Sequence, residues 1–450
     1  MARHHARTVL CLLALPCFAL ASLAKVSQVV AAPQPYVPQA TTCDGFPRVA
    51  IGMAPGFCAG LVMSPAAGDF RHRQVKTPRM LLQLPDGRHW LLTDLGSWTA
   101  GQGKLWLLEV ESSQQVHMKL LLGGLTMPHT VALGPDGNIY VAEMNRIFRL
   151  DMGAADAHAT TVVDGLPGNR LHPGRHPLSH FEFDRDGDLL VNVGADTDQC
   201  TDKTGGPLGP TCPESEGENA RGVIRRYVYL GQGRWDPTPK VMARGLRNSL
   251  VLVRHSSGTI LQGENSYDFA PSEDRPYDEI NIIRPDAHYG WPYCYDMSQS
   301  TPAWASSKAM DCNSPAHQKP VALLPPHAAP LAAVYYAGSM FPALKGKLLM
   351  SWHGYRPTGS RIVAFDVDAI GVPVIHANAR YPEYSAGGVI FKPYGAGPAA
   401  EPLVITPGWD LQAGSRPAGA PVGITVAQDG SLWVPDDRNA SILRIAADRQ

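Results

Sequence analysis

The sequence lacks the features that would place it in several large classes of protein. No long segment repeats apolar residues every 3.6 positions between capping signals, which argues against a helical domain. Positive and negative charge nearly cancel: 39 Lys and Arg stand against 40 Asp and Glu, for a formal net charge of -1. No overall field therefore attracts nucleic acid or an anionic membrane. The sequence contains no CxxC pair, which would be a sign of a metal site. We expect a small or neutral partner.

Glycine, proline and apolar residues are abundant instead. A chain of 450 residues that is 44% hydrophobic can bury a large core. The 44 Gly and 40 Pro residues indicate many short strands joined by elaborate loops. The composition predicts an all-β protein.

The first 32 residues have the pattern of a secretory signal peptide. Arg3 and Arg7 precede the run VLCLLALPCFALASLA, which is too short to span a bilayer. Small residues suited to cleavage follow at Ala24 and Ala32. We expect a periplasmic or secreted protein with no stable membrane anchor. A retained anchor is the weaker alternative, because a proline interrupts the apolar run and no second hydrophobic span follows.

Six cysteines remain once this segment is removed, which suits an oxidising compartment. Fifteen pairings are possible for six cysteines. Short separations favour three local disulfides, each closing one loop: Cys43 with Cys58, Cys200 with Cys212, and Cys294 with Cys312.

A unit of strand, tight turn and strand recurs along the chain and is followed each time by a further strand. Asp-Gly turns between β-rich runs are a hairpin signal, because glycine accepts the positive φ that such turns require. Six units of this kind predict a six-bladed β-propeller over residues 76–450, preceded by an extension over residues 33–75 that carries Cys43 and Cys58. Two stacked β-sandwiches are the alternative, although no linker divides the chain. The units are RMLLQLPDGRHWLLTD, HTVALGPDGNIYVAE, SHFEFDRDGDLLVNVG, SLVLVRHSSGTILQGEN, MFPALKGKLLMSWHG and GITVAQDGSLWVPDD.

Between residues 245 and 295 the motifs GLRN, GEN with a following aspartate, YDEIN and YGWPYC stand in one order. Further on come PPHAAPLAAVYYAGSMFP, KGKLLMSWHG and PVGITVAQDGSLWVPDD. In these motifs the chain resembles the soluble PQQ-dependent sugar dehydrogenases, especially the sorbosone and pyranose dehydrogenase-like quinoproteins, over roughly Arg79 to Ile445. The resemblance implies a six-bladed propeller that holds pyrroloquinoline quinone (PQQ) and Ca²⁺ and oxidises a sugar, an aldose-type aldehyde or a polyol. It suggests that electrons pass on to a cytochrome or to another carrier.

The resemblance also assigns roles to individual residues. Hydride transfer to a quinone needs a base for the hydroxyl proton and cations where negative charge develops. His176 matches the family's base, Arg247 would lie beside the quinone carbonyl and the substrate oxygen, and Asn248 would bond the cofactor's edge. Further contacts to the cofactor would come from Arg79, His327, His353 and Arg356. Calcium would be bound by the backbone carbonyls of Ser266 and Tyr267.

Each of these residues also has an ordinary structural interpretation. Arg247 could pair with an acidic neighbour, Asn248 could cap a turn, and the histidines could bond to backbone carbonyls. Tyr289, Trp291 and Tyr293 of YGWPYCY could wall a pyranose or pack in the core. Asp278 and Glu279 are better suited to structural hydrogen bonds than to a metal. Several positions depart from the family pattern and put quinone binding in doubt: Val251, His180, Phe181, Trp352 and Ala420.

Two other classes of function are open. A propeller that has lost its cofactor would bind a sugar or a protein through its loops. A calcium-dependent lactonase is weaker, because that chemistry needs carboxylates facing the channel and the acidic residues here lie mostly in predicted turns.

Overall fold

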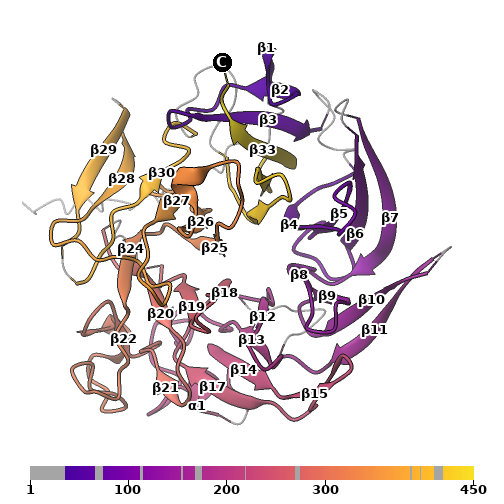
Figure 1. The fold of residues 1–450 in the computed structure, drawn as a ribbon. Coiled ribbons are helices and arrows are strands. Elements are labelled where there is room, and N and C mark those ends of the chain that lie inside the picture. Colours follow the sequence, from indigo (N-terminus) through magenta and orange to yellow (C-terminus); the bar gives the residue numbers. More distant parts are fainter. Residues whose placement is uncertain are drawn as a thin grey trace, which may run out of the picture. The chain divides into compact units, whose positions relative to one another are not determined.

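Six sheets follow one another around a ring, all antiparallel except for one parallel strand pair in the third sheet (Figure 1). The predicted all-β, six-bladed propeller is thereby confirmed. In this computed structural model every described residue lies in one unit, residues 33–450, and the predicted signal peptide falls outside the described residues. Those residues are 36–65, 74–111, 115–153, 156–167, 175–217, 219–268, 274–385, 388–395, 397–409 and 419–449.

The first three sheets, named from the innermost strand outward, follow the hairpin units closely. The first contains β4 (Pro78–Gln83), β5 (His89–Asp94), β6 (Gly103–Val110) and β7 (Val116–Leu125). The second contains β8 (Val131–Leu133), β9 (Ile139–Ala142), β10 (Ile147–Met152) and β11 (Ala157–Val163). The third contains β12 (Phe181–Phe183), β13 (Leu189–Val193), β14 (Val223–Tyr227), β17 (Lys240–Arg244) and β21 (Ala287–His288).

The other three sheets complete the ring. The fourth contains β18 (Val251–Arg254), β19 (Ile260–Glu264), β20 (Tyr277–Ile282) and β24 (Ala322–Pro326). The fifth contains β25 (Pro330–Tyr335), β26 (Leu348–Trp352), β27 (Arg361–Phe365) and β30 (Leu403–Val404). The sixth contains β31 (Thr425–Val426), β32 (Leu432–Asp436), β33 (Ser441–Ala447), β3 (Phe57–Met63), β2 (Phe46–Val49) and β1 (Pro38–Cys43).

Short elements decorate the connections between these strands. They are the hairpins β15 (Tyr229–Gly231) with β16 (Arg234–Trp235), β22 (Cys294–Tyr295) with β23 (Gln299–Ser300) and β28 (Arg380–Ser385) with β29 (Gly388–Pro393), the helix α1 (Pro213–Glu216), and 3-10 turns at Pro302–Trp304 and Pro342–Leu344. Within the described ranges, no helix has the length and apolar character needed to cross a membrane.

The glycines of the Asp-Gly turns have the positive φ angles expected of them. Gly87, Gly137 and Gly187 adopt φ of 75°, 77° and 84°, a region in which a side chain would be strained. The fifth unit is the exception, because its innermost strand is β25, before residues 340–354 rather than within them. A 3-10 turn replaces the Asp-Gly turn there, so the hairpin signal pointed to the wrong segment.

The sixth sheet joins the two ends of the described chain. Residue by residue, β3 pairs antiparallel with β33, from Phe57 with Ala447 to Met63 with Ile442 (Figure 1). The segment read from the sequence as an extension thus supplies outer strands of the last sheet, and the Cys43–Cys58 disulfide ties the end of β1 to β3. Pairing of this kind closes a ring and removes a sheet edge.

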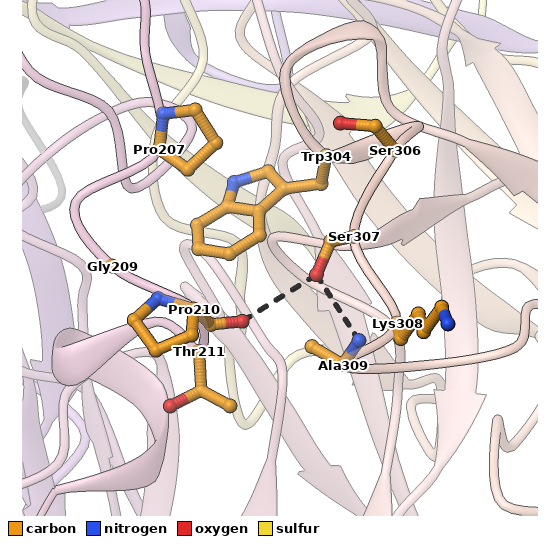
Figure 2. Close-up of a pocket in the computed structure, with 9 residues that line it drawn as sticks. All are labelled: Pro207, Gly209, Pro210, Thr211, Trp304, Ser306, Ser307, Lys308 and Ala309. Carbon is orange, nitrogen blue, oxygen red and sulfur yellow. Dashed lines mark hydrogen bonds between the residues drawn. The ribbon is translucent and has the colours of Figure 1, made fainter.

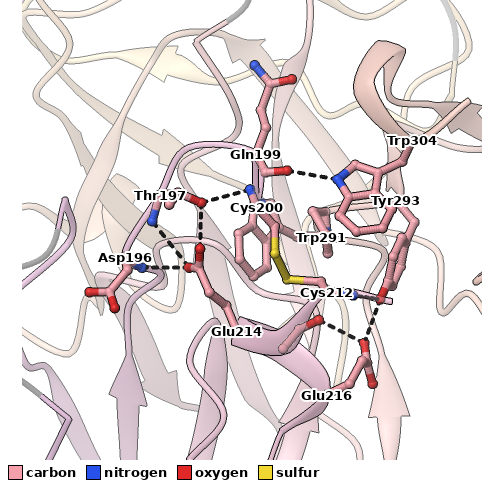
Figure 3. Close-up of a disulfide and its surroundings, with 12 residues drawn as sticks. Asp196, Thr197, Gln199, Cys200, Cys212, Glu214, Glu216, Trp291, Tyr293 and Trp304 are labelled. Carbon is pink, nitrogen blue, oxygen red and sulfur yellow. Dashed lines mark hydrogen bonds between the residues drawn. A yellow bond between two sulfur atoms is a disulfide. The ribbon is translucent and has the colours of Figure 1, made fainter. Parts of the chain in front are cut away.

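All three predicted local disulfides are present, and two of them close long insertions. The Cys200–Cys212 loop lies between β13 and β14, and the Cys294–Cys312 loop lies between β20 and β24. Figure 3 shows the indole of Trp304 from the second loop donating a hydrogen bond to the carbonyl of Gln199 in the first, at 2.8 Å. The two insertions therefore support each other.

Candidate cofactor and substrate site

The predicted site residues gather on one face of the ring, which we call the loop face. This face carries the connections that lead into each innermost strand and those that join the second and third strands. Antiparallel pairing places these connections together, as where Pro78 faces Asp94 in the first sheet and Pro330 faces Trp352 in the fifth. Every residue assigned from the resemblance lies in such a connection or at the end of a strand beside it.

A single residue, Ala195, links His176 to Arg247. The carbonyl of Ala195 accepts hydrogen bonds from the backbone N–H of His176 (3.2 Å) and from its Nδ1 (2.8 Å), while the N–H of Ala195 donates to the carbonyl of Arg247 (2.9 Å). Gly194 allows this approach, because a Cβ there would lie 2.4 Å from the carbonyl oxygen of His176. Residues 71 positions apart in the sequence thus meet across two sheets.

The state of His176 suits a proton acceptor. Burial, followed by the nearby charge of Arg247, holds the pKa of His176 well below its ordinary value of 6.5, so the imidazole is neutral at pH 7. With Nδ1–H donated to Ala195, the unprotonated nitrogen is Nε2. The described residues provide no hydrogen bond to Nε2, which is therefore open to a ligand.

Arg247 is buried and pairs with an acidic neighbour. Its guanidinium binds Asp198 through Nε (2.8 Å) and Nη2 (2.5 Å) and donates from Nη1 to the carbonyl of Asn265 (2.7 Å). Asp268 lies 3.6 Å from Nη2. The acidic partner that the sequence left open is thus Asp198. A guanidinium has five N–H groups, so these contacts fix its plane without using every donor.

Asn248 uses its backbone for structure and leaves its amide uncommitted. Its N–H donates to Oε1 of Glu264 (3.1 Å), and its carbonyl accepts from the N–H of Asn265 (3.2 Å). The half-buried side-chain amide makes no hydrogen bond to any described residue. An uncommitted amide at this depth supplies a donor and an acceptor for a ligand.

A second cluster joins four sheets around Asp437. Arg79, from β4, binds one oxygen of Asp437 through Nη1 and donates from Nε to Nδ1 of His129 (3.2 Å). His353 binds the other oxygen of Asp437 through Nε2 (2.9 Å). Burial would raise the pKa of Asp437, but the charges of His353, Arg79 and Arg438 lower it overall, so the carboxylate stays charged.

His129 and Asp437 were missed from the sequence. Both are positioned by the fold, His129 just before the innermost strand β8 and Asp437 just after β32. Like His176 and Arg247, His129 lies in a connection that leads into an innermost strand. That position, repeated from sheet to sheet, is the signal that could have found it.

Two further predicted residues lie on the fifth sheet's loops. His327 precedes β25 with a positive φ of 58°, and Gly354 packs against it so closely that a Cβ would lie 2.1 Å from its carbonyl oxygen. Arg356 follows β26, and its carbonyl accepts a hydrogen bond from Gly359 (2.9 Å). Both side chains are half-buried.

Asp278 holds the backbone of Ser266, one of the two predicted calcium ligands. One carboxylate oxygen of Asp278 accepts the N–H of Ser266 (2.9 Å) and the other accepts the N–H of Ala329 (2.7 Å), which is the structural role expected for it. Tyr267 donates its hydroxyl to the carbonyl of Cys294 (2.8 Å). Within the described ranges, no group of three or more His, Cys, Asp or Glu could hold a metal, so the proposed ion would depend on backbone carbonyls.

Three aromatic residues of YGWPYCY pack in the core. Tyr289, Trp291 and Tyr293 are only 4%, 3% and 4% exposed, and the Trp291 indole donates to the carbonyl of Asp198 (2.9 Å). The packing interpretation therefore describes them in this structure, and none presents a free ring face.

The departures from the family pattern are accommodated by the fold. Val251 forms an ordinary strand residue opposite Gly263, where a Cβ would lie 2.9 Å from that of Val251. His180 bonds to Thr130 and to the carbonyl of Leu252, which makes it structural. The remaining three, Phe181, Trp352 and Ala420, are buried.

Four acidic residues lie on this face, Asp198 and Asp437 in loops and Glu264 and Asp278 in strands. Asp198, Glu264, Asp278 and Asp437 all lie beside the predicted site residues, because strand ends and insertions that are distant in sequence meet there. Each is bonded to protein donors. Burial raises the pKa of Glu264 and of Asp278 to about 7.

A pocket of about 470 Å³ opens elsewhere, between the two disulfide-closed insertions (Figure 2). Ser307 bridges its sides with a hydrogen bond to the carbonyl of Pro210 (3.5 Å). The lining residues are Pro207, Gly209, Pro210, Thr211, Trp304, Ser306, Ser307, Lys308 and Ala309. None of the predicted site residues lines this pocket.

One protein-family model matches the central part of the chain. The model of the Glucose / Sorbosone dehydrogenase family matches residues 147–354, which contain His176, Arg247, Asn248, Ser266, Tyr267, His327 and His353. This match confirms the resemblance drawn from the motifs.

Solved structures with low sequence identity share the fold. An iodide structure of a Trichoderma reesei family AA12 carbohydrate-active enzyme has a TM-score of 0.64 at 17% identity, over 93% of this chain and 98% of that one. The holo PQQ domain of Coprinopsis cinerea pyranose dehydrogenase has a TM-score of 0.58 at 20% identity (90% and 100%). PQQ-bound aldose sugar dehydrogenase from Streptomyces coelicolor has a TM-score of 0.53 at 16% identity (88% and 100%).

A curated relative by sequence is an uncharacterized Borreliella burgdorferi protein, 30% identical over 140 residues. The match spans 29% of this chain and 35% of that protein.

Proposed function

We propose that this chain is a secreted or periplasmic PQQ-dependent dehydrogenase that oxidises a sugar, an aldose-type aldehyde or a polyol. The observation that carries the proposal is the Ala195 bridge, which holds an imidazole with an open Nε2 beside a fixed, buried guanidinium. The signal-like N-terminus and the three disulfides support the location.

The residues present fit an anionic quinone. PQQ, when bound, supplies the two-electron acceptor for the substrate hydride. His176 takes the hydroxyl proton at Nε2, and the remaining N–H groups of Arg247 stabilise the negative charge that develops nearby. The Asn248 amide bonds the ligand's edge. Further cationic groups would come from Arg79, His327, His353 and Arg356. The calcium ligands would be the backbone carbonyls of Ser266 and Tyr267.

A propeller without redox chemistry is the second candidate, and one observation favours it. The charges of Arg247 and Arg79 are already compensated by Asp198 and Asp437, which weakens their attraction for a carboxylated cofactor. Such a protein would bind a sugar or a protein on the loop face.

Reconstitution distinguishes the two candidates. Purified protein is mixed with PQQ and Ca²⁺, its absorption spectrum is recorded with and without a chelator, and dye reduction is followed with a panel of sugars and polyols. The proposal expects a bound-cofactor spectrum that chelation abolishes, and dye reduction with at least one substrate. Absence of both cofactor binding and dye reduction would favour the second candidate.

The base assignment has its own variant. His176→Ala should lower turnover by about 10²- to 10⁴-fold while the cofactor still binds. His117→Ala, at an exposed histidine of β7, is the control and should leave turnover unchanged. Full turnover in His176→Ala would contradict the assignment and make His327 the next candidate.

A further inference from the structure

Tyr355 is an exposed aromatic residue beside the predicted site. It lies between β26 and β27 on the loop face, flanked by Gly354 and Arg356, and it is 46% exposed. The aromatic residues first considered as a substrate wall are buried, so they present no ring to a ligand. Exposure alone is common for a tyrosine and carries no function. What distinguishes Tyr355 is how its ring is held.

Two residues from different sheets orient the Tyr355 ring. The guanidinium carbon of Arg438, from the connection between β32 and β33, lies 4.4 Å from the ring centroid. His353 meets the ring with 4.9 Å between centroids and 61° between planes. A cation against a tyrosine face and an edge-to-face contact are both favourable arrangements. The ring is therefore oriented before any ligand arrives, which lowers the entropic cost of stacking on it.

Polar groups suited to sugar hydroxyls lie next to this ring. Nε2 of His353 is bonded to Asp437, and its other ring nitrogen, Nδ1, has no hydrogen bond to any described residue. The Tyr355 hydroxyl likewise has none. A pyranose presents an apolar C–H face and a rim of hydroxyls, and sites for such ligands combine an aromatic surface with a few fixed polar groups.

We propose that Tyr355, oriented by Arg438 and His353, is a stacking subsite for a pyranose ring and helps determine substrate specificity. The inference rests on the proposed function for its choice of ligand class, a neutral sugar. It concerns binding, so it is tested without turnover.

The experiment measures sugar binding to the protein without added cofactor. Saturation-transfer NMR with D-glucose, D-galactose and D-xylose identifies bound sugars and the ring protons nearest the protein, and competition titrations give Kd. Tyr355→Ala should weaken binding about three- to tenfold, the range expected for loss of one aromatic contact. Tyr355→Phe and Tyr355→Trp should bind within about twofold of the wild type, because both keep a ring. Saturation should be strongest on one C–H face of the sugar.

Phe391 provides the matched control. It is an exposed ring on β29, 39% exposed, with the guanidinium of Arg380 6.0 Å from its centroid. Phe391→Ala should leave sugar binding unchanged. Circular dichroism and PQQ titration establish that Tyr355→Ala is folded and keeps its cofactor affinity.

The outcomes separate this inference from the proposed function. Sugar binding lost in Tyr355→Ala but kept in Phe391→Ala supports the subsite even if the wild type reduces no dye. Dye reduction with an unchanged Kd and KM in Tyr355→Ala overturns the subsite alone. A loss of PQQ affinity without a loss of sugar affinity also overturns it, as does a wild type to which none of the sugars binds.

Discussion

The imidazole Nδ1 of His176 donates a hydrogen bond to the backbone carbonyl of Ala195 at 2.8 Å. A carbonyl fixes the tautomer of an imidazole but, unlike a carboxylate, adds no charge that would favour the imidazolium. The bond to Ala195 raises the pKa of His176, but burial and then the charge of Arg247 outweigh it, so the pKa stays low while Nε2 remains a directed acceptor. Four tests follow from the way this site and its ring are held.

The pH dependence of catalysis should reflect the lowered pKa of His176. The neutral imidazole is the reactive form, so kcat/KM should hold as the pH falls through 6.5 and drop only at the lowered pKa. Because Arg247 is a secondary cause of the shift, Arg247→Gln should move this acid limb to higher pH as well as reduce activity. The measurement is kcat/KM against pH in the reconstituted enzyme. A wild-type limb at or above pH 6.5 would contradict the prediction.

Asp198→Asn should destabilise the protein. The amide has one acceptor oxygen in place of two and leaves the buried charge of Arg247 poorly compensated, at a cost of about 1–3 kcal/mol in the free energy of unfolding. Urea denaturation measures the loss. The control is Asp151→Asn, because Asp151 pairs with Arg149 at a more exposed site and should change stability by less than about 1 kcal/mol. Equal effects in the two variants would show that burial of Arg247 does not matter.

Asp278 should make stability depend on pH with a known sign. Its folded-state pKa, about 7, lies above the ordinary value of 3.8 because the group is buried. The folded protein therefore holds this proton more tightly, and its contribution to stability falls as the pH rises from about 4 to about 7.

Asp278→Asn removes that titration but also one acceptor for the amides of Ser266 and Ala329. We expect the variant to be less stable than the wild type at pH 5, by about 1–3 kcal/mol, with a smaller deficit at pH 8. Urea midpoints at the two pH values, without added Ca²⁺, test this. A deficit that grows toward pH 8 would falsify the sign.

The effect of the β3–β33 pairing on association and stability should be separable from the effect of the Cys43–Cys58 disulfide. Removing the chain through Met63 deletes β3 and leaves β33 with an unpaired edge, which favours association between copies. Cys43→Ser/Cys58→Ser keeps the strand pairing and should lower stability by about 3 kcal/mol, as expected for a loop of this length. Size-exclusion chromatography and thermal unfolding distinguish the two. A truncated chain that elutes and unfolds like the full-length protein would refute the role of β3.

By itself, the sequence determined the elements that depend on neighbours in the chain. Asp-Gly turns between apolar runs specify hairpins through glycine's access to positive φ, and short cysteine separations favour local disulfides. The family motifs around GLRN and YDEIN added the expected location of the site and its residue types.

Tertiary structure alone decided which distant residues meet. The pairing of β3 with β33, the partners Asp198 and Asp437, the contribution of His129 and the exposure of Tyr355 all depend on contacts between residues far apart in sequence. Local pattern cannot specify such contacts, because they form only when six sheets pack around one axis and bring their loops to the same face. The same packing buried Tyr289, Trp291 and Tyr293, which the sequence could assign either to a substrate wall or to the core.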